Sequence, residues 1–93
     1  MASYRIFETA TFREDLARLS RSGLARLEEK LREYVYPQMR EEPHLGANVK
    51  RLKNWSPPTW RYRVGAWRFF YEIDEKDRFV VMIAAEHRSG AYR

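Results

Sequence analysis

Four arginines in the C-terminal half of the chain could together bind a phosphate group. Arg61 and Arg63 are two positions apart in a stretch of alternating apolar and charged residues, so they would project from one face of a strand. Arg68 lies in the aromatic run that follows, and Arg88 lies near the end of the chain. Because a guanidinium binds phosphate oxygens through a planar pair of N–H groups, four of them would form an anion clamp. The alternative for Arg61 or Arg63 alone is the solvent side of an amphipathic strand.

Two further residues near this clamp could move protons. His87 carries an imidazole, whose charge changes near neutral pH, which suits a general acid or base. Tyr92 could stack on a nucleobase or exchange a proton through its hydroxyl. The structural alternatives are that His87 caps the last strand and that Tyr92 packs back onto the sheet. A ribonuclease without a metal ion must deprotonate a 2′-hydroxyl, stabilise a phosphorane and protonate the 5′-oxygen, and these side chains could meet those needs.

The charge distribution also favours a polyanionic partner. The chain carries 18 Lys and Arg against 13 Asp and Glu, and residues 44–71 contain no acid at all. Lys50, Arg51 and Lys53 lie in this acid-free stretch, where we expect them to bind the RNA backbone. A metal-dependent nuclease would need Asp or Glu ligands in the same stretch, so the sequence predicts neither a metal ion nor another cofactor.

The hydrophobic pattern predicts the elements that position these residues. Alternation predicts a first strand, and helical spacing then predicts two helices, the first capped by Thr11 with Glu14 and the second kinked at Pro37. A meander of three strands follows, because β-branched and aromatic residues alternate with charged ones between short polar turns. The expected strands are 3–8, 60–64, 67–73 and 78–85, and the expected helices are 12–20 and about 24–40.

These elements predict a single α+β domain over residues 1–93. A helical hairpin should pack on one face of a four-stranded, mainly antiparallel sheet in the order β-α-α-β-β-β, with the first strand antiparallel to a strand of the meander. The chain has no cysteine, and its first residues show no signal-peptide pattern. Both features favour the cytoplasm.

Over nearly its whole length, the chain resembles the RelE/ParE superfamily of bacterial toxins. The resemblance rests on four segments in order: Leu52-Lys53-Asn54, residues 60–65 (WRYRVG), residues 67–73 (WRFFYEI) and residues 87–93 (HRSGAYR). The family commonly shows L-K-G, Y-R-x-R-x-G-x-x-R-x-x-Y and a final H-R-x-x-x-Y. The proline in the second helix and the loop 55–59 (WSPPT) depart from its usual pattern.

This resemblance implies the toxin of a type II toxin–antitoxin system, bound in a hetero-oligomer to an antitoxin encoded beside it. RelE-like members cleave mRNA, usually in the ribosomal A site, whereas ParE-like members inhibit DNA gyrase without cleaving anything. The convergent cations favour the RelE-like branch, with mRNA and the ribosome as partners. A basic binding module that has lost its toxicity is a third alternative.

Overall fold

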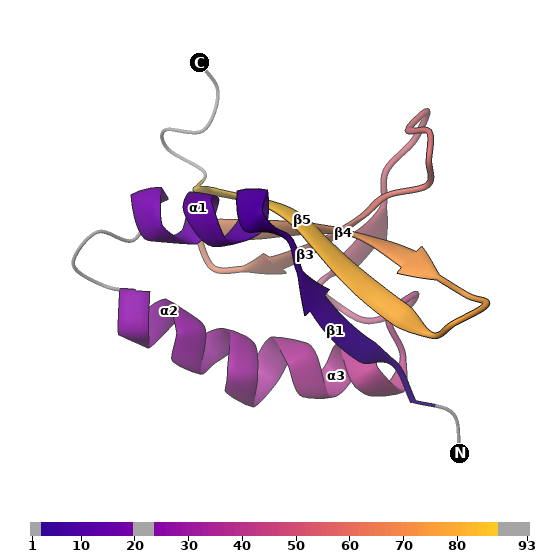
Figure 1. Cartoon of the computed structure of the whole chain (residues 1–93), viewed down its shortest axis with the longest axis horizontal. Coiled ribbons are helices and arrows are strands. Elements are labelled where there is room, and N and C mark those ends of the chain that lie inside the picture. Colours follow the sequence, from indigo (N-terminus) through magenta and orange to yellow (C-terminus); the bar gives the residue numbers. More distant parts are fainter. Residues whose placement is uncertain (1–2, 20–23, 88–93) are drawn as a thin grey trace.

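The computed structural model describes residues 3–19 and 24–87, which form a two-layer α+β fold. A five-stranded sheet has the order β1-β5-β4-β3-β2, and Figure 1 shows the helices running beside it. No helix in the described ranges is long and apolar enough to cross a membrane. The elements are β1 (Arg5–Glu8), α1 (Ala10–Leu19), α2 (Leu24–Lys30), η1 (Leu31–Val35), α3 (Tyr36–Glu41), β2 (Val49–Arg51), β3 (Trp60–Val64), β4 (Trp67–Asp74) and β5 (Phe79–His87).

Both helical segments cover the same face of the sheet, as the sequence predicts. Phe12 and Leu16 from α1 and Leu31 from η1 join one buried cluster with Phe69 and Met82 from the central strands. The rings of Phe12 and Phe69 meet edge to face at 6.2 Å between centroids. Because strand residues alternate between faces, every second residue of β4 is left on the opposite side of the sheet.

Two predictions about the sheet are corrected by the structure. The sheet has five strands rather than four, because Val49–Arg51 forms a short strand antiparallel to β3. Three residues are too few to produce a recognisable alternation. The first strand is parallel to β5, not antiparallel to the meander, and pairs with it from Arg5↔Phe79 to Glu8↔Met82. Residue alternation assigns a strand's faces but carries no information about its direction.

The cap of α1 also differs from the prediction. The helix begins at Ala10, and the backbone N–H of Phe12 donates to the Thr9 hydroxyl at 3.1 Å. Thr9 therefore takes the capping place that we expected for Thr11. The Thr9 hydroxyl also donates to the carbonyl of Met82 at 2.9 Å, so the start of α1 is attached to β5.

The helix that runs through α2, η1 and α3 continues past Pro37, as the apolar spacing predicts. A π-helical turn at Leu31–Val35 precedes the proline, and the N–H of Tyr36 donates to the carbonyl of Leu31. Proline has no N–H, and its ring crowds the carbonyl four residues earlier, here that of Glu33. The wider π turn gives that carbonyl more room, so the helix continues without ending at the proline.

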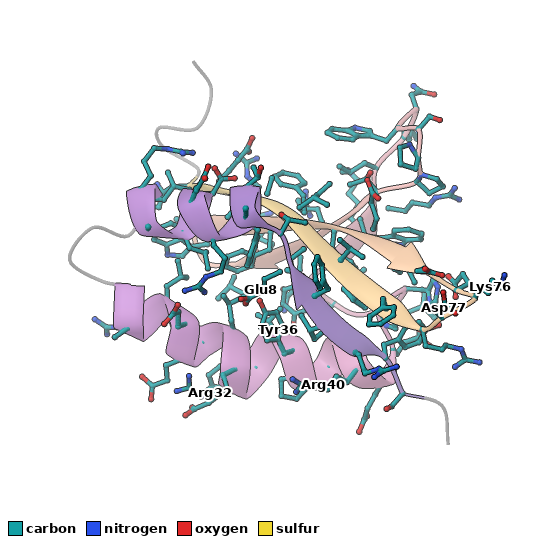
Figure 2. All side chains as sticks on the ribbon, in the orientation of Figure 1. Glu8, Arg32, Tyr36, Arg40, Lys76 and Asp77 are labelled. Carbon is teal, nitrogen blue, oxygen red and sulfur yellow. The ribbon has the colours of Figure 1, made fainter. Side chains whose placement is uncertain are left out.

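Tyr36 connects this helix to the first strand. Its hydroxyl donates to Oε2 of Glu8 at 2.5 Å, and Figure 2 shows the two labelled side chains meeting between β1 and the helix. Burial is the main cause that raises the pKa of Tyr36 far above its usual value, and the hydrogen bond to Glu8 adds to it. The contact joins the two layers at the side of the sheet that β1 forms.

Candidate functional site

The strand register gathers cations on the face of the sheet opposite the helices, which we call the open face. Lys50, Arg61 and Phe70 lie opposite one another on β2, β3 and β4. Arg63 and Arg68 form the next row, directly opposite each other on β3 and β4. The sequence prediction that Arg61, Arg63 and Arg68 share one face therefore agrees with the register.

The three arginines line a common hollow of about 100 Å³ with Gly65 and Ala66, which form the tight turn between β3 and β4. Like charges placed directly across an antiparallel pair destabilise a sheet. Arg63 and Arg68 occupy such a pair. Arg61 adds a third charge, and its Nε is buried without a hydrogen-bond partner among the described residues. An anion in the hollow would offset both costs.

A larger pocket adjoins this hollow and shares Arg61 and Arg68 with it. Its volume is about 350 Å³. The apolar part of its wall consists of Leu52, Trp55, Phe70, Ile83 and Ala84, and Glu86 completes the polar part. The loop between β2 and β3, which carries Trp55, projects from the sheet in Figure 1.

Trp55 and Phe70 form the aromatic wall of this pocket. Their rings are nearly parallel, with an angle of 9° between planes and 6.4 Å between centroids. Trp55 remains 53% exposed, although tryptophan is among the most apolar side chains in area. Trp60 behaves differently, because it stacks on Tyr71 and packs against the core.

The remaining predicted RNA-binding residues line the end of the site formed by β2. Lys50 is exposed opposite Arg61. Arg51 pairs with Trp60 and lies over its ring, with 5.6 Å between the Arg51 Cζ and the ring centroid, so it projects on the face opposite Lys50 and Arg61. Lys53 lines a third hollow of about 310 Å³ that shares Leu52 and Trp55 with the larger pocket. The larger pocket therefore adjoins both of the other hollows, and each of the three has cations in its wall.

A β-bulge in β5 decides which of its last residues reach the open face. Phe70 pairs with Ala84 while Tyr71 pairs with Met82, so Ile83 is an extra residue in β5. Before the bulge the even-numbered Val80 and Met82 face the core, and after it the odd-numbered Ala85 does. The bulge therefore places Glu86 beside Arg68 on the open face, with 3.4 Å between Arg68 Nη2 and Glu86 Oε1.

His87 lies on the other face, so the structure does not bring it together with the three arginines. It pairs with Trp67, and the two rings meet edge to face at 4.7 Å. Trp67 in turn packs against the core on the helix side. Arg88, the fourth arginine of the predicted clamp, and Tyr92 lie outside the described residues.

Nothing in the sequence indicated Glu86 as a site residue, and for Trp55 the sequence left base stacking as the alternative to packing. Glu86 lies outside the acid-free stretch 44–71 on which the predicted nucleic-acid surface was based. Trp55 follows Lys53 closely in a loop containing two prolines, and this exposed aromatic beside cations was the one available signal.

Another polar cluster surrounds His44, which the sequence suggested was a surface residue. His44 Nδ1 lies 2.9 Å from Glu42 Oε2, and Nε2 lies 2.5 Å from Glu75 Oε2. Burial alone would lower the pKa of His44, but hydrogen bonds with Glu75 and then Glu42 outweigh it and raise the pKa. The cluster is not part of the open face and joins the loop after α3 to the turn between β4 and β5.

Comparison with known proteins relates this chain to one family. Residues 6–92 match the family described as the ParE toxin of type II toxin–antitoxin system, parDE. No sequence among curated proteins matches the chain.

Three solved structures are similar over most of the chain. A chain of the RelBE2 toxin–antitoxin complex from Mycobacterium tuberculosis is 29% identical, with a TM-score of 0.74 over 96% of this chain and 95% of that one. A chain of the RelE–RelB complex from Pyrococcus horikoshii is 21% identical, with a TM-score of 0.68 and coverages of 96% and 99%. The YoeB/ParE toxin from Agrobacterium tumefaciens is 20% identical, with a TM-score of 0.71 and coverages of 89% and 96%. The last two likenesses concern the fold alone.

Proposed function

We propose that this chain, which belongs to the ParE toxin family of type II toxin–antitoxin systems within the RelE/ParE superfamily, acts by cleaving mRNA without a metal ion, in the A site of the ribosome. The observation that carries this proposal is the convergence of Arg61, Arg63 and Arg68 around one hollow on the open face. A toxin that works only by contacting another protein has no need of a phosphate site.

In the proposed reaction the 2′-oxygen of one nucleotide attacks the adjacent phosphorus, and the bond from phosphorus to the 5′-oxygen breaks. The products are a 2′,3′-cyclic phosphate and a free 5′-hydroxyl. The three guanidiniums would bind the non-bridging oxygens, whose charge increases in the transition state.

Proton transfer is assigned to residues beyond β5. We propose that Arg88 and Tyr92 act at the leaving 5′-oxygen and the attacking 2′-hydroxyl. The position of His87 against Trp67, on the face away from the arginines, favours a role in positioning the end of β5 over a direct proton transfer. Lys50, Arg51 and Lys53 would bind the RNA backbone on the β2 side of the scissile phosphate.

The proposed partners are a cognate antitoxin, mRNA and the ribosome, and the proposed location is the cytoplasm. The Mycobacterium structure is that of a toxin–antitoxin complex, and the Pyrococcus structure is that of a RelE–RelB complex. The cationic open face fits an acidic antitoxin segment that folds on binding. The proposed inhibited state is therefore a hetero-oligomer of toxin and antitoxin.

The test is to incubate the purified protein with ribosomes carrying a defined mRNA and to map the ends of the fragments. We expect cleavage within the A-site codon that leaves a 5′-hydroxyl and a cyclic phosphate. Arg61→Ala should abolish it, whereas Arg32→Ala, an exposed cation on η1, should not. Intact mRNA together with inhibition of DNA supercoiling by purified gyrase would establish the ParE-like alternative, which the name of the matched family favours.

A further inference from the structure

The larger pocket on the open face has the composition of a nucleobase site rather than of a phosphate site. Its wall is mostly apolar, with Trp55 and Phe70 as its aromatic members, and its volume is about 350 Å³. This volume lies at the lower end of the roughly 300–1,000 Å³ found for pockets that hold small molecules. We infer that this pocket, called here the base pocket, holds one unstacked guanine of single-stranded RNA, stacked on Trp55 and read by Glu86.

The neighbouring hollow fixes the kind of ligand. Arg61 and Arg68 line both the base pocket and the arginine hollow, so a group bound in one lies next to a group bound in the other. A nucleotide provides such a ligand, because its ribose links a planar aromatic base to an anionic phosphate. The inference rests on the proposed function, because it places the base of a nucleotide next to the scissile phosphate.

Trp55 provides the stacking surface. The side chain is 53% exposed, and its ring lies nearly parallel to that of Phe70. Trp55 also lines the hollow that contains Lys53, so the RNA backbone on the far side of the base would meet a cation there. Proteins bind single-stranded RNA by this combination of aromatic platforms and a cationic path along the backbone.

Glu86 selects among the bases. It is the one acid in the wall of the base pocket, and its Oε1 lies 3.4 Å from Nη2 of Arg68. An ionised carboxylate only accepts hydrogen bonds, so it favours a base edge with adjacent donors. Guanine presents N1–H and the 2-amino group side by side, whereas uracil places its single N–H between two carbonyl oxygens that a carboxylate repels.

The binding test uses uridine hexamers made uncleavable by 2′-O-methylation, with a central guanosine, inosine, uridine or abasic site. The wild-type protein should bind the guanosine hexamer about 5- to 150-fold more tightly than the abasic one, the range expected for stacking one base. Trp55→Ala should abolish this preference for the guanosine hexamer, and Trp55→Phe should retain most of it. Tyr34→Ala, which removes another exposed aromatic from η1, should leave it unchanged.

The role of Glu86 in selecting the base is tested by comparing the affinities for the guanosine and inosine hexamers, because inosine lacks only the 2-amino group of guanosine. We expect the wild-type protein to prefer guanosine by about tenfold, because a hydrogen bond to a charged acceptor is lost in inosine. Glu86→Gln should bring the two affinities together. If Glu86→Gln instead strengthened binding of all four hexamers equally, Glu86 would only neutralise Arg68, and its selective role would be overturned.

The base pocket and the ribonuclease activity can fail separately. Equal affinity of the wild-type protein for guanosine and abasic hexamers would overturn the base pocket, even if the protein cleaves mRNA. A preference for guanosine that depends on Trp55, in a protein that leaves mRNA intact on the ribosome, would support the pocket and contradict the nuclease.

Discussion

Asp15 on α1 accepts a hydrogen bond from the backbone N–H of Ala85 on β5, with 3.0 Å between Ala85 N and Asp15 Oδ2. Asp15 is only 9% exposed, and its other oxygen accepts from Arg18 at 2.8 Å. Ala85 directly precedes Glu86 and follows the bulge at Ile83. A carboxylate from the helical layer therefore supports the strand at the position where it enters the candidate site.

Asp15→Ala should destabilise the protein, because it leaves the buried N–H of Ala85 without an acceptor. The expected loss in the free energy of unfolding is about 1–3 kcal/mol, measured by urea denaturation. Arg18→Ala is the matched control, since it removes the other partner, whose side chain is 62% exposed, and should cost less than about 1 kcal/mol. Similar losses in both variants would mean that the ion pair, not the bond to β5, matters.

Stability should fall in alkaline solution because of two buried tyrosines. Burial raises the pKa of both Tyr36 and Tyr71 far above the usual value near 10. As the pH rises past 10, the unfolded chain loses these protons while the folded protein keeps them, so the free energy of unfolding decreases. Each tyrosine should contribute a slope of about 1.4 kcal/mol per pH unit.

Urea unfolding at several pH values above 10 measures this slope. Tyr36→Phe should make it shallower by the contribution of one proton, and Tyr34→Phe, which alters an exposed tyrosine of the same helix, should not. An unchanged slope in Tyr36→Phe would show that this tyrosine ionises in the folded protein as easily as in the unfolded one.

The His44 cluster should stabilise the protein in a window of mildly acidic pH. The raised pKa of His44 means that its contribution is full below about 6.5 and is lost as the pH rises through the raised value. A hydrogen bond from the backbone of His44, then one from its ring, lowers the pKa of Glu42. The hydrogen bond with His44 is also the main cause that lowers the pKa of Glu75. Their contributions are therefore full above about 4.5 and are lost as the pH falls through the lowered values.

His44→Ala should lower the melting temperature at pH 5.5 by on the order of a few degrees, because partly exposed ion pairs contribute little. At pH 8 the difference from wild type should be smaller. A difference that stays constant over this range would show that His44 acts only through its packing between Tyr4 and Trp60, whose rings it meets at 6.1 and 5.7 Å.

Substitutions of different cations should affect RNA binding and RNA cleavage separately. Lys53→Ala should weaken RNA binding. It should also reduce the slope of log affinity against log salt concentration by about 0.7, which is the value for the loss of one phosphate contact on a single strand. It should leave the cleavage rate at saturating RNA almost intact. Arg68→Ala and Arg88→Ala should lower that rate in single-turnover measurements. If all three changed only the affinity, the arginines would not act in the chemical step.

An antitoxin should change the end of β5. We predict that it fills the cationic hollow or displaces residues 87–93, because either change would keep RNA away from the arginines or from the groups proposed to transfer protons. Hydrogen exchange of the backbone amides from Ala84 to His87, measured with and without antitoxin, checks this. Unchanged exchange would exclude displacement and leave blockage of the open face as the means of inhibition.

Alternation was sufficient to predict much of this site. Arg61 and Arg63 share a face because they are two residues apart, and the short turn at Gly65 brings Arg68 opposite them. Alternation gives the wrong result in β5. Val81 faces the open side, and counting from it in steps of two would place His87, rather than Glu86, on the open face. The extra residue at the bulge reverses the count, and it is fixed by how β5 pairs with β4 rather than by local sequence. The base pocket was equally hidden, since it depends on a loop that brings Trp55 onto Phe70.

The bulge at Ile83 also has a consequence for how this protein could change by insertion or deletion. Removing one residue there would exchange the faces of everything that follows in β5, so an imidazole would replace a carboxylate beside the arginines without any substitution. A single codon lost or gained at this point would convert an acceptor of hydrogen bonds into a group that titrates near neutral pH. Relatives with the same fold and the same arginines could therefore differ in base preference, or in catalytic group, through length alone.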